Sequence, residues 1–415
     1  MSLLLNLLFV HQLDAAQFGA YSVSHSLSLT ALGIVNALVL EPVSVFGLSW
    51  KSRARLYAVI QIAILVCISG LFAGIILGIG LVRPNWLPLE LQSVLRTLAL
   101  GLPALQLPWL VRRLSYLYEM HWLALAGSLA SLVAAVSLSL AVQVETAEAA
   151  LRSHIGVVAL PALLATIALI ITGGAARSVG GHKSTSETGQ LLAESTEYGG
   201  SIGLIVLKQQ WSFAAPLLAS NLLSAIATQL HNYYFAAAYR LEAAAELRAL
   251  QLFFAPLQTV LTASGIYILP RLVRAAHAEA GRGLGEFARH ANIILLAGSI
   301  LYVGIAALLL PVASAWLNRP GYAVSALEFG VMSVSFLLAA ATLVPQATLK
   351  ALKRTAPVAL ASTIGALTSL FCSVPLAASL GVIGAALTLI VRNVTTFGII
   401  AHALRRVQRR EVDGG

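Results

Sequence analysis

Long apolar segments alternate with short polar or charged interruptions along almost the whole chain. Eleven of these segments are long enough to cross a bilayer as helices, because a membrane-spanning helix needs about 20 apolar residues. The expected spans are residues 18–48, 57–82, 91–111, 121–142, 155–175, 203–234, 247–270, 291–317, 322–349, 356–379 and 382–404. The pattern predicts an all-α, polytopic membrane protein of about 12 helices, the first of them short.

The first apolar stretch differs from the others in length. It covers residues 3–10, and His11 and Gln12 then interrupt it. Twelve helical residues rise about 18 Å, roughly half of a 30 Å hydrocarbon core. We therefore expect a first helix that lacks its inner half. The alternatives are a cleaved signal peptide, although no lysine or arginine precedes Lys51 to form its basic start, and a short re-entrant segment.

One polar stretch divides the spans into two groups of six. Residues 177–201 are rich in Gly, Ser and Thr and have no sustained apolar periodicity, which is typical of a flexible linker. The expected organisation is an N-terminal transmembrane lobe at 1–176, a cytoplasmic linker at 177–201 and a C-terminal lobe with a basic tail at 202–415.

Composition agrees with a membrane protein and explains the charge. The chain is 59% hydrophobic and 10% charged, and its net charge is +10. A soluble chain so basic would suggest nucleic acid, but nineteen of the 26 lysines and arginines fall in alternate loops and six in the loops of opposite parity. Such asymmetry marks the cytoplasmic side. We expect a cytoplasmic C-terminus, contact with the bilayer and no nucleic-acid partner.

Several stretches are similar to parts of one transporter family. In "LDAAQFGAY", residues 13–21, the residues Leu13, Phe18, Gly19 and Tyr21 match a turn written L-G-x-x-x-[FY]-G-x-Y, and Asp14 replaces its glycine. The stretches "LVLEPVSVFG", "ILPRL" and "LGVIGAAL" follow in order, and "LEAA" at 241–244 echoes "LDAA" at 13–16. Together they resemble the polysaccharide (O-antigen) flippases of the multidrug/oligosaccharidyl-lipid/polysaccharide (MOP) exporter superfamily.

The resemblance implies a two-lobed transporter in the bacterial inner membrane. It would flip a lipid-linked oligosaccharide, carried on undecaprenyl pyrophosphate, to the periplasmic leaflet by alternating access, with H⁺ or Na⁺ as a coupling ion and polysaccharide assembly machinery as a partner. An organic-cation (multidrug) antiporter of the same superfamily and a non-transporting fragment are the alternatives. An enzyme is not expected, because the outside loops are short, the longest covering residues 143–154.

A flippase for an anionic glycan needs cations and hydrogen-bonding groups that face an internal cavity. Arg392 stands near the middle of an apolar segment, where it must face protein or water. A polar stripe at helical spacings of 3, 4 and 3 occupies one face of the 203–234 span. It consists of Asn221, Ser224, Thr228 and His231. Packing between helices is the alternative role for these residues.

Two ionisable residues of the 18–48 span are further candidates. His25 could bind phosphate or relay protons, or it could simply be buried. Glu41 is the only carboxylate deep inside an apolar segment, and it precedes Pro42, which can kink a helix. We interpret Glu41 as an ion-coupling site or as a partner of the nearby Lys51, Arg53 or Arg55.

Two basic clusters adjoin span ends on the expected cytoplasmic side, where they could capture a pyrophosphate or only anchor the topology. They comprise Arg112, Arg113, Lys350, Lys353 and Arg354. 

Other features predict architecture. Cys67 and Cys372 are expected to be small buried residues, and Gly70, Gly74 and Gly78 to form a close-packing helix face. The chain has no G-x-x-x-x-G-K-[ST] loop and no Cys/His spacing of a metal site. No cofactor or metal is therefore expected.

Overall fold

The computed structural model describes residues 2–47, 50, 53–82, 89–141, 143–172, 202–238, 241–277, 283–316 and 324–413. The expected linker at 177–201 and Lys51 lie outside these residues. All regular elements in the described part of the chain are helices, so the all-α prediction is confirmed.

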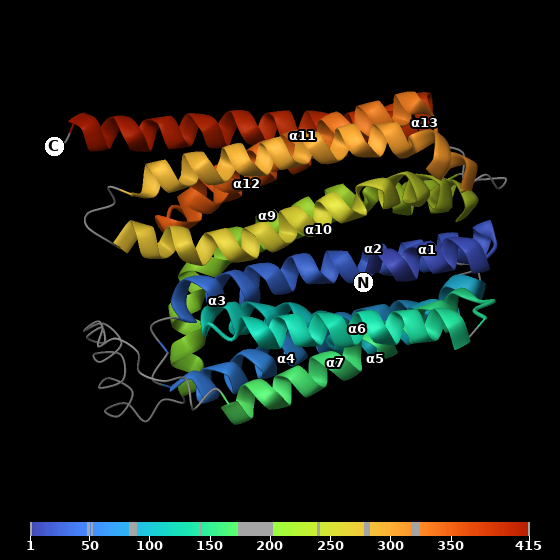
Figure 1. The fold of residues 1–415 in the computed structure, drawn as a ribbon, viewed down its shortest axis with the longest axis horizontal. Helices are drawn as coiled ribbons and strands as arrows, with labels where there is room; N and C mark the ends of the chain where they lie inside the picture. The colour runs from blue at the N-terminus through green and yellow to red at the C-terminus, as the bar shows by residue number, and fades with distance from the viewer. Residues whose placement is uncertain are drawn as a thin grey trace.

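The helices form two groups that lie side by side in one bundle (Figure 1). We call α1–α7 the first lobe and α9–α13 the second lobe. The first lobe comprises α1 Ser2–Gln12, α2 Ala15–Val35, the π-helix η1 Asn36–Leu40, α3 Glu41–Phe46, α4 Ala54–Val82, α5 Leu89–Leu117, α6 His121–Ala141 and α7 Ala147–Thr172. The second comprises α9 Ile202–Ala238, α10 Leu241–His277, α11 Leu284–Trp316, α12 Ala326–Ala351 and α13 Thr355–Asp413.

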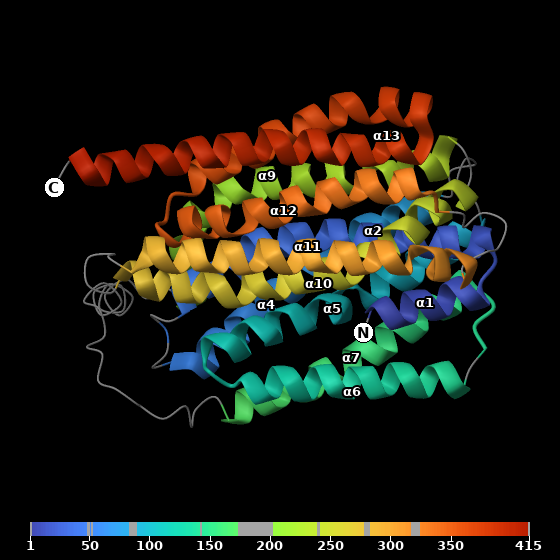
Figure 2. The same ribbon diagram turned by 45° about the horizontal axis from the view of Figure 1, so that its top comes forward.

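The predicted spans correspond to these helices. Within the described residues, nine helical segments are long and apolar enough to cross a membrane, and α9, which bends by 54° near Pro216, makes a tenth. The last of the nine, α13, contains two helices joined at Gly381, whose φ of 58° and ψ of −132° favour glycine. These two halves double back on each other (Figure 2) and correspond to the expected spans 356–379 and 382–404.

The opening stretch forms the short helix α1, which packs into the first lobe. Leu5 and Phe9 are fully buried, and the Phe9 ring meets the Tyr21 ring edge-on at 5.0 Å between centroids. The next helix begins three residues earlier than expected, because the Asp14 side chain caps it by accepting a 2.7 Å hydrogen bond from the Gln17 N–H.

The helix that follows the first echoed stretch meets the second echoed stretch. The two stretches begin α2 and α10, and a Cβ added to Gly19 of α2 would lie 2.1 Å from the carbonyl oxygen of Leu241. The absence of a side chain at Gly19 therefore lets α2 and α10 approach each other closely. Because α2 also packs on α9, it is the principal contact of the first lobe with the second.

Two packing predictions are wrong. Cys67 is exposed and Cys372 is half-buried. Around Gly70, Gly74 and Gly78, no described atom lies within 4 Å of where a Cβ would stand, so this face of α4 does not pack closely. Lipid tails are as apolar as a helix neighbour, and small apolar residues are consequently stable on either kind of surface.

Candidate functional site: a polar cavity between the lobes

A cavity of about 390 Å³ lies between the two lobes and is lined by polar side chains. The first lobe contributes residues at the junction of α2, η1 and α3, and the second contributes faces of α9, α12 and α13. Its polar lining consists of Asn36, Glu41, Asn221, Ser224, Thr228, Thr342, Gln346, Lys350, Ser362, Arg392, Asn393 and Thr396. Polar groups at this depth of an apolar bundle mark a hydrated or ligand-filled space.

Arg392 of α13 occupies the second-lobe wall. Its guanidinium donates hydrogen bonds to the hydroxyls of Ser224 and Thr228 on α9, so these two members of the predicted stripe orient it. Gly365, in the other half of α13, makes room: a Cβ there would lie 2.4 Å from the Thr396 hydroxyl and 3.1 Å from the Arg392 carbonyl oxygen. Among the described residues, no carboxylate forms an ion pair with Arg392. Its charge therefore remains available to a ligand.

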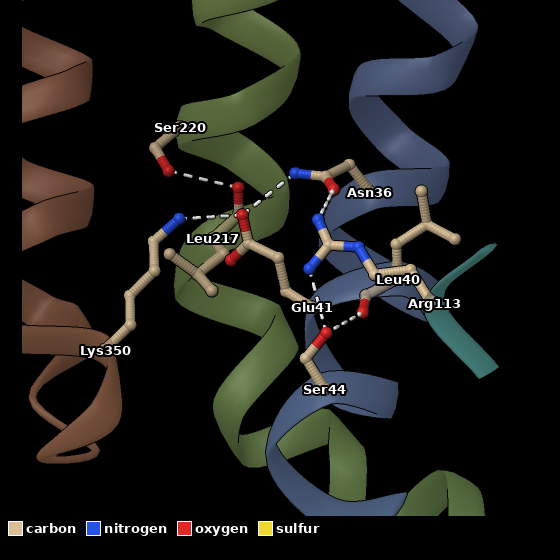
Figure 3. Close-up of polar contacts among 8 residues, drawn as sticks. All are labelled: Asn36, Leu40, Glu41, Ser44, Arg113, Leu217, Ser220 and Lys350. Atoms are coloured by element: carbon tan, nitrogen blue, oxygen red, sulfur yellow. Dashed lines mark hydrogen bonds and ion pairs between the residues drawn. The ribbon is translucent and has the colours of Figure 1, made fainter. Parts of the chain in front are cut away.

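Glu41 of α3 lies at the opposite wall and joins the two lobes. Its Oε1 accepts a 2.7 Å hydrogen bond from Lys350 Nζ of α12 and a 2.8 Å bond from Asn36 Nδ2 (Figure 3). Glu41 is 5% exposed and Lys350 15%. Glu41 Oε2 is buried and has no hydrogen-bond partner among the described residues. Half of the carboxylate thus retains the capacity to accept a proton or another donor.

Arg113 of α5 orients the residues next to Glu41. It donates from Nη2 to Asn36 Oδ1 at 3.3 Å and from Nη1 to Ser44 Oγ at 2.8 Å, and Ser44 in turn donates to the carbonyl oxygen of Leu40 (Figure 3). Asn36 therefore bridges the guanidinium and the carboxylate. Glu41 therefore contacts one cation, Lys350, directly and is connected to a second cation, Arg113, through the Asn36 amide.

A π turn explains why Asn36 and Glu41 share a face. The backbone N–H of Glu41 donates to the carbonyl of Asn36, five residues earlier. In a regular α-helix, residues five apart point in different directions, whereas a π turn brings them together. Pro42 follows directly, and its missing N–H and bulky ring disfavour a regular α-turn at this point. The irregularity expected from Pro42 thus takes the form of a π-helix that builds the site.

The partner of Glu41 corrects the sequence-based interpretation. We expected Lys51, Arg53 or Arg55, which are close in sequence. Lys51 lies outside the described residues, Arg53 is exposed, and Arg55 donates to the carbonyl oxygen of Ile171 at 2.7 Å. Lys350, 309 positions away, takes that place.

Two predicted candidates lie outside this cavity. His231 continues the α9 stripe, but it is buried, and its Nε2 lies 3.3 Å from the hydroxyl of Ser373. His25 packs among the rings of Tyr21 and His154, at 6.2 and 5.8 Å between centroids. In both cases the imidazole contacts neighbouring helices of the bundle.

The five basic residues expected at the mouth separate into two sets. Lys350 lines the cavity, and Arg113 reaches it through Asn36. Arg112 instead lies 5.7 Å above the Trp109 ring, while Lys353 and Arg354 are exposed in the turn after α12. 

Sequence reasoning missed half of the polar lining. The missed residues are Asn36, Thr342, Gln346, Ser362, Asn393 and Thr396. Asn393 adjoins Arg392 in sequence and donates to the carbonyl oxygen of Ser335 at 2.9 Å. Thr342, Gln346 and Lys350 follow one another at intervals of four in α12, a helical stripe that could have identified this wall.

Several solved structures that are similar to this chain are described as MATE transporters. A multidrug resistance MATE family transporter of the MOP superfamily, in an inward-facing conformation, matches 98% of this chain and 94% of its own, with a TM-score of 0.62 and 14% identity. The MATE transporter VcmN of Vibrio cholerae matches with a TM-score of 0.59 at 14% identity, covering 98% and 94%. The eukaryotic MATE transporter AtDTX14 covers 99% and 93% with a TM-score of 0.68 at 12% identity.

No family model matches the sequence, and no curated protein matches it. The identities to the solved structures are low, so these likenesses establish the fold and not the substrate. The chain therefore has the fold of these MATE transporters.

Proposed function

We propose that the protein is a membrane transporter that carries a lipid-linked oligosaccharide through the inter-lobe cavity by alternating access. In this proposal the lobes at 1–176 and 202–415 rock about the cavity and expose it to each side of the bacterial inner membrane in turn, with the C-terminus in the cytoplasm. The MATE-type fold supports the transport class, and the chemistry of the cavity supports the substrate.

The observation that carries the substrate assignment is the charge of the cavity. Arg392 and Lys350 line it together with a single acid, Glu41, which already accepts from Lys350. An uncompensated arginine in a low-dielectric site favours an anion, and a guanidinium binds phosphate oxygens in a two-pronged geometry. A pyrophosphate that binds here would approach Arg392 and compete with Glu41 for Lys350.

The remaining lining suits a sugar next to that phosphate. Asn221, Gln346 and Asn393 provide amides, and Thr342 and Ser362 provide hydroxyls, which can donate to and accept from a sugar's hydroxyl groups. The volume of about 390 Å³ lies at the lower end of the range for ligand sites, about 300–1,000 Å³. The cavity would therefore hold the pyrophosphate and the adjoining sugar, while the lipid chain stays in the bilayer.

Breaking the Glu41–Lys350 contact is a necessary step in this mechanism. The pair joins α3 of one lobe to α12 of the other, so the lobes cannot separate at this level while it persists. A substrate phosphate that takes Lys350 would free Glu41, and an H⁺ or Na⁺ could then neutralise the carboxylate. This gives the coupling ion a defined position.

A multidrug antiporter is the second candidate, and the fold comparison favours it more directly. One of the similar structures is described as a multidrug resistance transporter. In this case Glu41, freed from Lys350, would bind an organic cation or the coupling ion. The charge of Arg392 opposes that role, because a like charge in the cavity repels a cationic substrate.

The experiment uses a strain that lacks the gene, complemented with the natural chain, Arg392→Ala or Arg405→Ala. Arg405 is an exposed arginine of the same helix and serves as the control. Lipid-linked glycans are extracted and quantified by mass spectrometry, and a membrane-impermeant label assigns their leaflet. Tolerance to organic cations and the membrane abundance of each variant are measured in the same strains.

For a flippase, glycan-lipids accumulate in the cytoplasmic leaflet of the deletion strain, and the natural chain and Arg405→Ala restore the normal distribution. Arg392→Ala should lower transport on the order of tenfold to a hundredfold at normal abundance, since it removes hydrogen bonds from a charged group. Unchanged glycan pools together with reduced tolerance to organic cations would replace the flippase assignment with the antiporter.

A further inference from the structure

A second pocket, of about 240 Å³, lies between the lobes. It is formed where α5 and α10 end, and these helix ends lie on the side of the bundle that carries the C-terminus (Figure 1). The first lobe contributes Tyr116, Glu119 and His121 at the junction of α5 and α6. The second contributes Tyr267, Arg271 and Arg274 of α10. None of the residues that line it also lines the polar cavity. It is therefore a separate site, and the transport proposal does not use it.

The pocket contains more positive than negative charge. Arg274 Nη1 lies 3.9 Å from Glu119 Oε1, a loose ion pair whose side chains are 48% and 63% exposed. The Arg271 guanidinium lies 3.9 Å above the Tyr267 ring, and no described carboxylate or carbonyl accepts a hydrogen bond from it. The ring contact leaves its N–H groups free to bind a ligand. One arginine is thus weakly paired with an acid, and the other is not paired with one.

The pocket lies at the boundary of the apolar spans. The α5 span ends at Leu117, the α6 span begins at His121, and the α10 span ends at Ala276. Lipid headgroups meet a membrane protein at this level, where tyrosines and arginines are the residue types that contact them. Ile266 and Pro270 add apolar lining on the side of α10 that leads into the span, so a ligand here can be charged at one end and apolar at the other.

We propose that this pocket binds the headgroup phosphate of an anionic phospholipid, which would bridge the two lobes. A phosphodiester carries one negative charge, which balances the excess of two arginines over one glutamate. Arg271 and Arg274 are three residues apart on α10, so both reach the same side of that helix and can donate to one phosphate group. Glu119 competes with the lipid for Arg274.

This competition distinguishes a phosphate site from a simple clamp between lobes. If the Glu119–Arg274 pair only holds the lobes together, Glu119→Gln and Arg274→Gln have the same effect. If the pocket binds a lipid phosphate, they have opposite effects, because the first removes a competing acid and the second removes a ligand-binding cation. 

The test is native mass spectrometry of the purified full chain in detergent, titrated with phosphatidylglycerol or phosphatidylcholine. The variants are Arg271→Gln, Arg274→Gln and Glu119→Gln. Arg289→Gln is the matched control, because Arg289 is an exposed arginine of α11 outside the pocket. Only folded protein that retains bound lipid is counted, so a loss of yield is not read as a loss of binding.

We expect phosphatidylglycerol to bind more tightly than phosphatidylcholine. Each arginine variant should weaken this binding about fivefold, as expected for one cation at a membrane surface. Glu119→Gln should strengthen it, and Arg289→Gln should leave it unchanged. Equal binding of phosphatidylcholine, or weaker binding by Glu119→Gln, would overturn the proposal. Inorganic phosphate is the final probe: if it displaces the lipid at equal concentration, the pocket binds a free anion instead.

Discussion

Within the described parts of the chain, two ion pairs connect the lobes, and their surroundings differ sharply. In Glu41–Lys350 the charged atoms are 2.7 Å apart, and the side chains are 5% and 15% exposed. In Glu119–Arg274 they are 3.9 Å apart, and the side chains are 63% and 48% exposed. Both are pairs of a glutamate with a basic residue, but removal of one partner costs far more free energy in the buried pair. Burial removes the water that would otherwise stabilise the remaining charge.

The buried pair also belongs to a network, whereas the exposed pair has no further side-chain hydrogen bond among the residues that the structure describes. Asn36, Arg113 and Ser44 extend the contacts of Glu41 into the first lobe (Figure 3). Because each hydrogen bond in this network constrains the next, the Glu41 carboxylate is held in one position. In the exposed pair, Arg274 can exchange Glu119 for another anion, as a surface pocket that binds a ligand requires.

The largest effect is expected for Lys350→Met, which leaves the Glu41 carboxylate buried without its cation. Removing one partner of a buried pair typically destabilises a protein by about 3–5 kcal/mol. We expect a clear fall in the thermal unfolding temperature of the purified protein in detergent. Lys353→Met, at the exposed turn after the same helix, should leave that temperature unchanged.

The double variant Glu41→Gln/Lys350→Met controls for loss of the lysine side chain itself. It should recover part of the stability, because the buried carboxylate without its cation is gone, while Arg113 keeps its hydrogen bonds to Asn36 and Ser44. A single Lys350→Met variant as stable as Lys353→Met would show that the pair does not hold the lobes together.

An intermediate effect is expected for Asn36→Leu, which removes the bridge between Glu41 and Arg113. A buried group that loses its partner costs about 1–3 kcal/mol, and here two contacts of one side chain disappear. Ser44→Ala is the comparison variant, since it removes one acceptor of Arg113 and leaves Asn36 in place. Urea unfolding of both proteins should rank Asn36→Leu as the less stable; the reverse order would contradict a bridging role for Asn36.

The smallest effect is expected for Glu119→Gln. An exposed pair at this distance contributes at most about 1 kcal/mol, and salt screens it further. The unfolding temperature in detergent should shift little in low salt and not at all in high salt. A shift as large as that of Lys350→Met, or one that salt does not change, would remove the contrast between the two pairs.

Part of the cavity could be predicted from the sequence because two simple rules apply to it. A charge in an apolar span must face protein or water, which pointed to Arg392, and spacings of three and four place polar residues on one helix face. These rules identified Arg392 and, separately, the stripe of Asn221, Ser224 and Thr228; the structure then places Ser224 and Thr228 against the arginine. They do not determine where along a helix the cavity ends. His231 shares the face but contacts Ser373.

The other wall depends on contacts that no local rule contains. Asn36 and Glu41 are five residues apart, an offset that only the π turn converts into a shared face. Gly70, Gly74 and Gly78 illustrate the converse, because the spacing of a close-packing motif occurs where no neighbour is present. A prediction from helical spacing requires that the helix is regular and that a neighbouring helix packs on that face. The sequence of one segment shows neither.

The sequence by itself determined which segments form helices long and apolar enough to cross a membrane, because apolar length is a property of each segment separately. The tertiary structure alone decided which polar side chains meet. Glu41 and Lys350 are 309 positions apart, and Arg274 meets Glu119 across the lobes. Such pairs form only when two lobes dock, since the free energy of a contact depends on the distance and burial of atoms that the chain order leaves unspecified.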